Sequence, residues 1–144
     1  MTERVVDLAR GWIGTPYMHQ ASSCGVGADC LGLLRGIWRS LYGTEPEIPP
    51  AYTPDWGEIG GRELLMAGAL RHLLPVGAYA AMEPGQVLLF RMRHGAVAKH
   101  LGILAEAGDR PGFIHAYDRH GVIESPLSGP WRGRIAARFR FPGN

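Results

Sequence analysis

Apolar side chains near the N-terminus recur at intervals of three and four residues. They are Val5, Leu8, Ala9, Trp12 and Ile13. This spacing places side chains on one face of an α-helix. Thr2 is a suitable N-cap, and Gly14 and Pro16 end the pattern. The chain is therefore predicted to begin with a helix that buries one face.

A second helix is predicted to begin at residue 30, where Asp29 can act as the N-cap. One face then carries the apolar residues Cys30, Leu33, Leu34, Ile37, Trp38 and Leu41, and Gly43 ends the helix. Four prolines between residues 44 and 56 predict a long excursion without regular structure. A less regular pattern, interrupted by Gly68, predicts a third helix over residues 62–74.

After residue 85 the pattern changes to short segments divided by Gly, Pro and Asp, which is typical of strands. The expected strands cover residues 86–93, 98–105, 112–117, 122–125 and 134–141. Helices followed by hairpin-connected strands predict an α+β fold, with N-terminal helices packed on an antiparallel sheet of about five strands. The chain has no internal repeat or low-complexity linker, so residues 1–144 are predicted to form one domain.

Composition narrows the classes of protein that fit. With 46% hydrophobic and 19% charged residues, the chain has the material for a core despite 21 glycines and 11 prolines. A net charge of +2 without a block of like charges does not favour nucleic-acid binding. No apolar run is long enough to insert into a membrane. The N-terminus lacks the apolar segment of a signal peptide, so synthesis in the cytoplasm is expected.

Cys30 lies in the first turn of the predicted second helix. The unpaired N–H groups and the dipole of a helix N-terminus favour a thiolate, which lowers the pKa of the thiol and produces a nucleophile. Cys30 is also in phase with the apolar stripe, and a small buried side chain would fit that position equally well. Position alone leaves both interpretations open.

Two histidines on neighbouring predicted strands are candidates for the base that such a nucleophile needs. Alternation places Leu101 and Ile103 on one face of their strand and His100 on the other. His115 lies on the next strand, and cross-strand neighbours can approach to about 5 Å. One ring could then orient the other, although each could also be an ordinary half-buried histidine. His19 is a further candidate, because its loop leads towards Cys30.

Metal chemistry and disulfide formation are not expected. Cys24 and Cys30 are six residues apart, which matches no usual zinc-ligand spacing. A disulfide between them would require an oxidising compartment. We therefore predict no metal and no cofactor.

Five segments, taken in order and spacing, resemble the NlpC-type cell-wall peptidases, which are papain-like cysteine peptidases of bacterial murein. The segments are Gly14–Tyr17, Gly27–Leu33, Pro84–Phe90, His100–Ile103 and Phe113–Ala116. The stretch at residues 29–39, with the proline-rich excursion after it, looks most like the branch found among phage and gene-transfer-agent tail proteins.

The resemblance implies a role for several residues. Cys30 would be the nucleophile, His100 the general base and His115 the residue that orients His100. Tyr17 and Asp29 match family residues beside the nucleophile and are the candidate substrate-binding residues. The implied activity is a cysteine endopeptidase that cuts peptidoglycan stem peptides at the D-γ-glutamyl-diaminopimelate bond, within a phage-like tail that opens the cell wall.

The chain departs from the family pattern at Leu31, where the family commonly has Ser, at His19-Gln20 and at Gln86. Two alternatives to this activity remain open: a structural tail component without turnover, and a thiol amidase or acyl transferase on the same fold. For binding to tail or baseplate proteins, the excursion at residues 44–56 is a candidate surface. Its aromatic residues Tyr52 and Trp56 would either contact the partner or hold the loop on its own domain.

Overall fold

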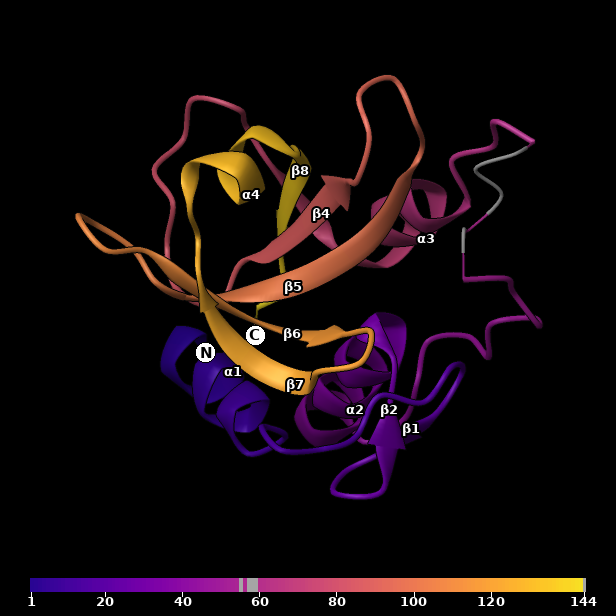
Figure 1. Cartoon of the computed structure of the whole chain (residues 1–144). Coiled ribbons are helices and arrows are strands. Elements are labelled where there is room, and N and C mark those ends of the chain that lie inside the picture. Colours follow the sequence, from indigo (N-terminus) through magenta and orange to yellow (C-terminus); the bar gives the residue numbers. More distant parts are fainter. Residues whose placement is uncertain (55, 57–59, 144) are drawn as a thin grey trace.

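The computed structural model describes residues 1–54, 56 and 60–143. Helices α1 (Thr2–Arg10) and α2 (Cys30–Tyr42) contact each other and pack on one face of an antiparallel sheet (Figure 1). The sheet order is β3 (Leu74–Val76), β8 (Ile135–Arg140), β4 (Val87–Arg91), β5 (Ala98–Glu106), β6 (Gly112–Tyr117) and β7 (Gly121–Pro126). The α+β prediction is therefore confirmed, with six strands in this sheet where about five were expected.

The elements that the sequence pattern missed are short. Strand β3 spans three residues and includes Pro75, so it shows no alternation to recognise. A hairpin of β1 (Ser22–Ser23) and β2 (Gly27–Ala28) lies between the first two predicted helices, where no strand was predicted. Helix α4 (Gly129–Gly133) is a single turn before β8. Helix α3 (Leu64–His72) begins two residues later than predicted and runs through Gly68 without interruption.

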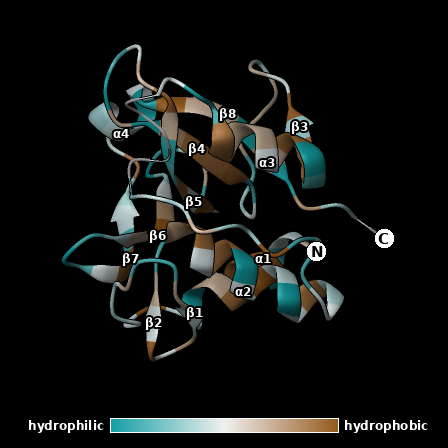
Figure 2. Cartoon of the chain, turned by 90° about the vertical axis from the view of Figure 1, so that its right-hand side faces the viewer, coloured by the Kyte–Doolittle hydropathy of each residue, from teal (hydrophilic) through white to brown (hydrophobic). Residues whose placement is uncertain are grey.

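The sheet separates two apolar clusters. Leu101, Ile103 and Ala105 of β5 belong to the larger one, which includes the buried residues of α1 and α2. The opposite cluster contains Phe90, Leu104 and Phe113, and α4 covers it with Trp131. Figure 2 shows the brown apolar positions concentrated where the helices meet the sheet. The expected alternation along β5 is thus confirmed, and it places His100 on the side away from Leu101.

One position of the predicted helical stripe is wrong. Helix α1 ends at Arg10, and Ile13 lies beyond it with 45% of its surface exposed. Trp12 nevertheless remains buried, because it packs against α2 at Gly36, where a Cβ atom would lie 2.0 Å from the indole ring. The first helix is therefore anchored by close approach of an aromatic ring to a glycine.

Candidate active site

Cys30 is the first residue of α2, and its position depends on Asp29. The Oδ1 atom of Asp29 accepts a hydrogen bond of 2.7 Å from the N–H of Gly32, which confirms the predicted N-cap. Gly32 itself is required, because a Cβ atom there would lie 1.8 Å from the carbonyl oxygen of Ala21. This close packing leaves Cys30 only 6% exposed at the start of the helix.

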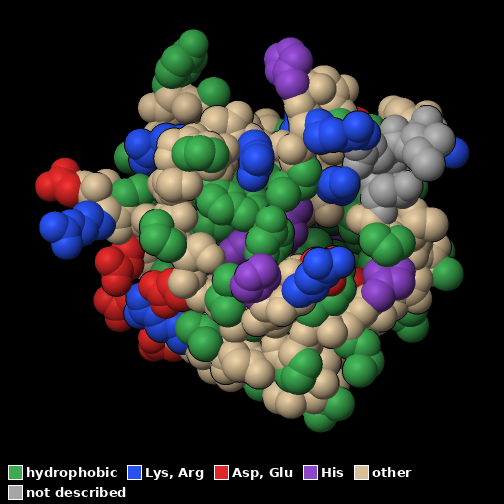
Figure 3. Space-filling view, in the orientation of Figure 1, with side chains coloured by type: hydrophobic (Ala, Val, Ile, Leu, Met, Phe, Trp, Pro, Cys, Tyr) green, Lys and Arg blue, Asp and Glu red, His purple; other side chains and the backbone are tan. Residues whose placement is uncertain are grey.

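Cys30 and His100 line the same cavity, which has a volume of about 230 Å³. Tyr17 and Asp29 line it as well, so four of the five predicted site residues meet there. The loop that carries Tyr17 is fixed by two backbone hydrogen bonds to Ala28, one on each side of the tyrosine. In Figure 3, histidine and hydrophobic side chains gather near the middle of the molecular surface, with Lys and Arg side chains around them.

His115, the fifth predicted residue, lies behind His100 and is 1% exposed. The Nε2 atom of His100 is 2.8 Å from the Nδ1 atom of His115. Strands β5 and β6 pair Ile103 with Ile114, so the two histidines are diagonal neighbours rather than directly opposite. Gly102 permits this contact, because a Cβ atom there would lie 3.2 Å from the Cβ atom of His115.

Aromatic rings enclose the histidine pair. The Trp131 ring centroid is 5.7 Å from that of His100 and 5.2 Å from that of His115, and Tyr117 contacts both histidines. Burial lowers the pKa of His100 from 6.5 to about 3, with a further contribution from His115. Burial also lowers the pKa of His115 to about 4. Both imidazole rings are therefore neutral at physiological pH.

The expectation of a low pKa for Cys30 is wrong. Burial and the neighbouring Asp29 carboxylate raise the pKa of the thiol to about 12. The backbone N–H groups of Leu101, Leu31 and Cys30 act in the opposite direction but do not compensate. The helix N-terminus is thus outweighed by desolvation, and the resting state pairs a neutral thiol with neutral histidines.

Asp29 also holds the proline-rich excursion against the site. Its Oδ2 atom accepts hydrogen bonds from the N–H of Gln20, at 2.7 Å, and from the hydroxyl of Tyr52. The backbone carbonyl of Tyr52 accepts a hydrogen bond of 2.7 Å from the side-chain amide of Gln20, and the Tyr52 ring stacks on Trp56 at 4.2 Å. These contacts favour the second interpretation of the two aromatics, in which they hold the loop on its own domain.

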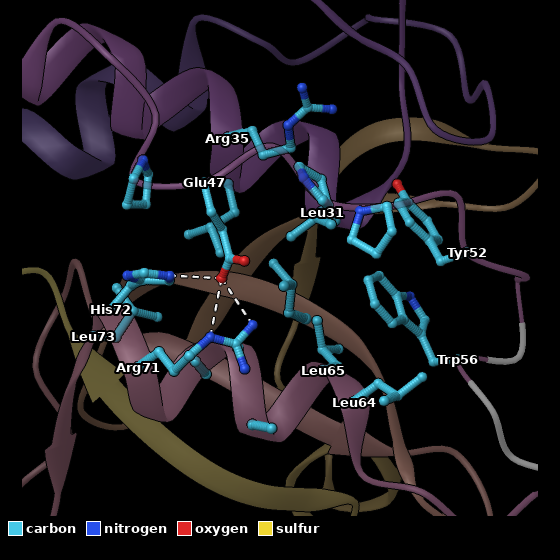
Figure 4. Close-up of a pocket in the computed structure, with 18 of the residues that line it drawn as sticks. Leu31, Arg35, Glu47, Tyr52, Trp56, Leu64, Leu65, Arg71, His72 and Leu73 are labelled. Carbon is cyan, nitrogen blue, oxygen red and sulfur yellow. Dashed lines mark hydrogen bonds and ion pairs between the residues drawn. The ribbon is translucent and has the colours of Figure 1, made fainter.

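Tyr52 and Trp56 also line a second pocket of about 420 Å³, which lies between α2 and α3 (Figure 4). Its walls are mainly apolar and include Leu31, the residue that departs from the family pattern. At its edge, Glu47 contacts Arg71 at 2.8 Å and His72 at 2.6 Å. The polar groups at this edge are therefore paired with one another, and the interior is hydrophobic.

Several residues of the site were not identified from the sequence. Lys99 and Asp118 line the cavity, Ser125 contacts His115, and Trp131 covers the histidine pair. His19 also lines the cavity, 3.7 Å from Asp29, in the loop that had made it a candidate. Within the described part of the chain, no group of three or more His, Cys, Asp or Glu side chains is arranged to hold a metal ion.

The fold is that of solved NlpC/P60 structures. An NlpC/P60 family protein from Bacillus cereus ATCC 10987 matches with a TM-score of 0.66 and 18% identity, over 98% of this chain and 40% of that one. A Staphylococcus aureus Mu50 protein, described as similar to a lipoprotein of the NLP/P60 family, matches with a TM-score of 0.63 and 20% identity, over 99% and 42%. The NlpC/p60 domain of the peptidoglycan hydrolase SagA matches with a TM-score of 0.57 and 19% identity, over 99% of both chains.

Among curated proteins, the chain is 28% identical over 141 residues to gamma-DL-glutamyl hydrolase of Bacillus subtilis (strain 168). The match covers 95% of this chain and 29% of that protein, so the chain spans less than a third of its length. No protein-family model matches the chain. These similarities relate the chain to the NlpC/P60 proteins, whose fold it shares. None of the helices in the described residues is long and apolar enough to span a membrane.

Proposed function

We propose that the protein is a cysteine endopeptidase that hydrolyses peptidoglycan stem peptides. The observation that carries this proposal is that Cys30 and His100 line one cavity while His115 contacts His100 from behind. A nucleophile, a base and a residue that orients the base are the three parts that thiol catalysis needs. The name of the SagA relative, a peptidoglycan hydrolase, supports the substrate class.

In the proposed mechanism, Cys30 begins as a neutral thiol. The Nε2 atom of His100 contacts His115, so the Nδ1 atom of His100 remains to accept the proton of the thiol. The sulfur attacks the scissile carbonyl carbon, and the backbone N–H of Cys30 donates to the oxygen that becomes negative. Because the free thiol is not ionised at rest, proton transfer accompanies the attack rather than preceding it.

The tetrahedral intermediate collapses when its C–N bond breaks and the leaving amine takes the proton from His100. A thioester between Cys30 and the acyl part of the substrate remains. His100 then accepts a proton from water, whose oxygen attacks the thioester carbon. The C–S bond breaks, the sulfur regains a proton, and a carboxylic acid leaves.

The proposed scissile bond joins D-glutamate to diaminopimelate through the γ-carboxyl group. The name of the B. subtilis relative, a gamma-DL-glutamyl hydrolase, supports a γ-glutamyl amide as the group attacked. Tyr17 and Asp29 are the proposed substrate-binding residues, since both line the cavity beside Cys30. Lys99, in the same wall, adds a positive charge suited to a carboxylate-rich peptide.

The test is to digest purified peptidoglycan and identify the fragments by mass spectrometry. The wild-type protein is expected to release fragments that end at D-glutamate, and Cys30→Ala is expected to release none. Cys24→Ala is the matched control, because Cys24 is exposed and does not line the cavity. Equal digestion by wild type and Cys30→Ala would refute the proposed nucleophile.

We further propose that the enzyme acts at the cell wall as part of a phage-like tail. The support is the resemblance of residues 29–39 and the following excursion to tail-associated members of the family. Tethering at a tail tip would raise the local enzyme concentration at the wall. Proteomic analysis of purified particles tests this location. If the protein were absent from the particles and found free in the lysate, the proposed location in a tail would be wrong.

Thiol-dependent acyl transfer is the second candidate, and the apolar pocket beside the cavity favours it. That pocket can hold a long hydrocarbon chain, whereas a stem peptide offers only short aliphatic groups among its carboxylates. The fragments again distinguish the two reactions, because transfer leaves the acyl group on an acceptor other than water. A catalytically idle tail component is the remaining alternative, and it predicts no product of either kind.

A further inference from the structure

We propose that Ser125 is a positioning residue of the candidate active site, which holds His115 in the tautomer that can orient His100. The inference rests on the proposed function for its catalytic consequence, but the tautomer itself is a property of the folded protein. Its basis is the contact between the Nε2 atom of His115 and the Oγ atom of Ser125, at 2.9 Å.

Strand pairing brings Ser125 to this position. Strands β6 and β7 are antiparallel and pair Phe113 with Ser125 and His115 with Ile123. His115 and Ser125 are therefore diagonal neighbours, as His115 and His100 are on the other side. The result is a continuous chain of polar contacts across three strands, from His100 through His115 to Ser125.

The direction of these hydrogen bonds decides whether His100 can act as a base. A neutral imidazole has one N–H donor and one acceptor nitrogen. When His115 carries its proton on Nε2, it donates to Ser125 and its Nδ1 atom accepts from the Nε2–H of His100. The Nδ1 atom of His100 then has a free lone pair that can accept the proton of Cys30.

The opposite tautomer would leave the site inactive. If His115 carried its proton on Nδ1, it would donate to His100, whose own proton would then lie on Nδ1. His100 could no longer accept a proton from Cys30. An acceptor at the Nε2 atom of His115 stabilises the productive arrangement, and the Oγ atom of Ser125 lies within reach to accept from an Nε2–H group. Because Ser125 is only partly buried, its own O–H group can donate to solvent rather than to His115.

His115 is buried among aromatic rings, so its hydrogen bond with Ser125 has few possible replacements. His115 is 1% exposed, and Phe113, Tyr117 and Trp131 place their rings around it. Within the described residues, the hydrogen bonds of the His115 ring go to His100 and Ser125. Ser125 is a neutral side chain. It can therefore orient the His115 ring without placing a negative charge beside it, which would favour the protonated imidazolium.

The direct test is to measure the tautomer of His115 by two-bond ¹H–¹⁵N spectra of protein labelled in histidine. Cys30→Ala protein is suitable, because the measurement does not need activity. His115 is expected to carry its proton on Nε2, and Ser125→Ala is expected to shift it to a mixture of tautomers. Ser125→Thr, which keeps the hydroxyl, is expected to restore the original state. Ser128→Ala is the control, because Ser128 is exposed and its side chain makes no capping hydrogen bond.

The catalytic consequence is measured separately on active protein. Ser125→Ala is expected to lower kcat about tenfold with little change in KM, because the substitution removes one hydrogen bond that orients His115. Ser125→Thr is expected to recover most of it. An unchanged tautomer in Ser125→Ala, or a changed tautomer with unchanged kcat, would overturn the proposal. If wild type cuts no peptidoglycan but the tautomer responds as expected, the proposed function fails and the assignment of the tautomer stands.

Discussion

The Nε2 atom of His100 lies 2.8 Å from the Nδ1 atom of His115, although the two residues are not direct partners on β5 and β6. The contact is diagonal, and it depends on Gly102, over which Phe113 and the Cβ atom of His115 pack. A single glycine within β5 therefore allows the two buried rings to share a hydrogen bond. Several expected outcomes depend on this pair.

Replacing His115 tests the orienting role. His115→Asn is expected to retain more activity than His115→Ala, because an amide can still hold the His100 ring and a methyl group cannot. His100→Ala is expected to abolish turnover. The measurement is kcat on a γ-glutamyl peptide substrate for the three variants. Wild-type turnover by His115→Ala would show that another residue orients the base.

The pH dependence of alkylation tests the state of Cys30. Because burial and Asp29 raise the pKa of its thiol to about 12, iodoacetamide is expected to modify Cys30 slowly throughout the neutral range. Cys24 is exposed and provides an internal reference in the same protein. Peptide mapping after timed alkylation gives both rates. Faster modification of Cys30 than of Cys24 at pH 7 would show a stabilised thiolate and contradict this expectation.

Acid is expected to destabilise the fold through the buried histidines. Their pKa values are about 3 and 4 in the folded protein, below the ordinary 6.5. The unfolded chain therefore binds protons first, so the free energy of unfolding falls as pH decreases below 6.5. Urea unfolding between pH 7 and 5, where most carboxylates remain ionised, measures the slope. His100→Gln is expected to reduce it, whereas His94→Gln, at an exposed position, is expected to leave it unchanged.

The sequence predicted those features of the site that depend on local spacing. The cap at Asp29 and the first-turn position of Cys30 follow from residues within one helical turn. The alternation along β5 separates His100 from Leu101 in the same way. By contrast, Ser125 and Trp131 reach the histidines through diagonal and cross-layer contacts, which no local pattern encodes. These are long-range contacts, and long-range packing also determines the burial of an ionisable group.

The pKa of Cys30 shows why the burial of an ionisable group cannot be predicted from local spacing. The sequence places the thiol at a helix N-terminus, where local electrostatics favours the thiolate. The folded structure removes the same thiol from water and places a carboxylate beside it, and these two effects are larger. The sign of the shift was therefore predicted incorrectly, although the position of the residue was predicted correctly.

The contact between Tyr52 and Asp29 is expected to stabilise the excursion at residues 44–54. Tyr52→Phe removes one donor from a carboxylate that is almost fully buried. The expected cost is about 1–2 kcal/mol in the free energy of unfolding, together with faster proteolysis of the loop. Tyr79→Phe is the control, because Tyr79 is fully exposed. Equal stability of the two variants would show that the hydroxyl contributes nothing to the attachment of the loop.

The same substitution is expected to have opposite effects at two helical glycines. In Gly36→Ala the new Cβ atom would lie 2.0 Å from the Trp12 ring, so the segment that follows α1 must move away from α2. Overpacking of this kind costs about 1–3 kcal/mol. In Gly68→Ala the new atom meets only the Nη2 atom of Arg71, at 3.7 Å, beside the apolar pocket.

At Gly68 the intrinsic preference of the helix therefore decides the outcome. Alanine in a helix interior is more favourable than glycine by about 0.5–1 kcal/mol, so Gly68→Ala is expected to raise the free energy of unfolding. Urea unfolding of both variants, with fluorescence of the tryptophans as the signal, measures the difference from wild type. If Gly36→Ala were as stable as wild type, α1 and α2 would not be in close contact at Trp12. Destabilisation by Gly68→Ala would show that the space beside α3 is filled in solution.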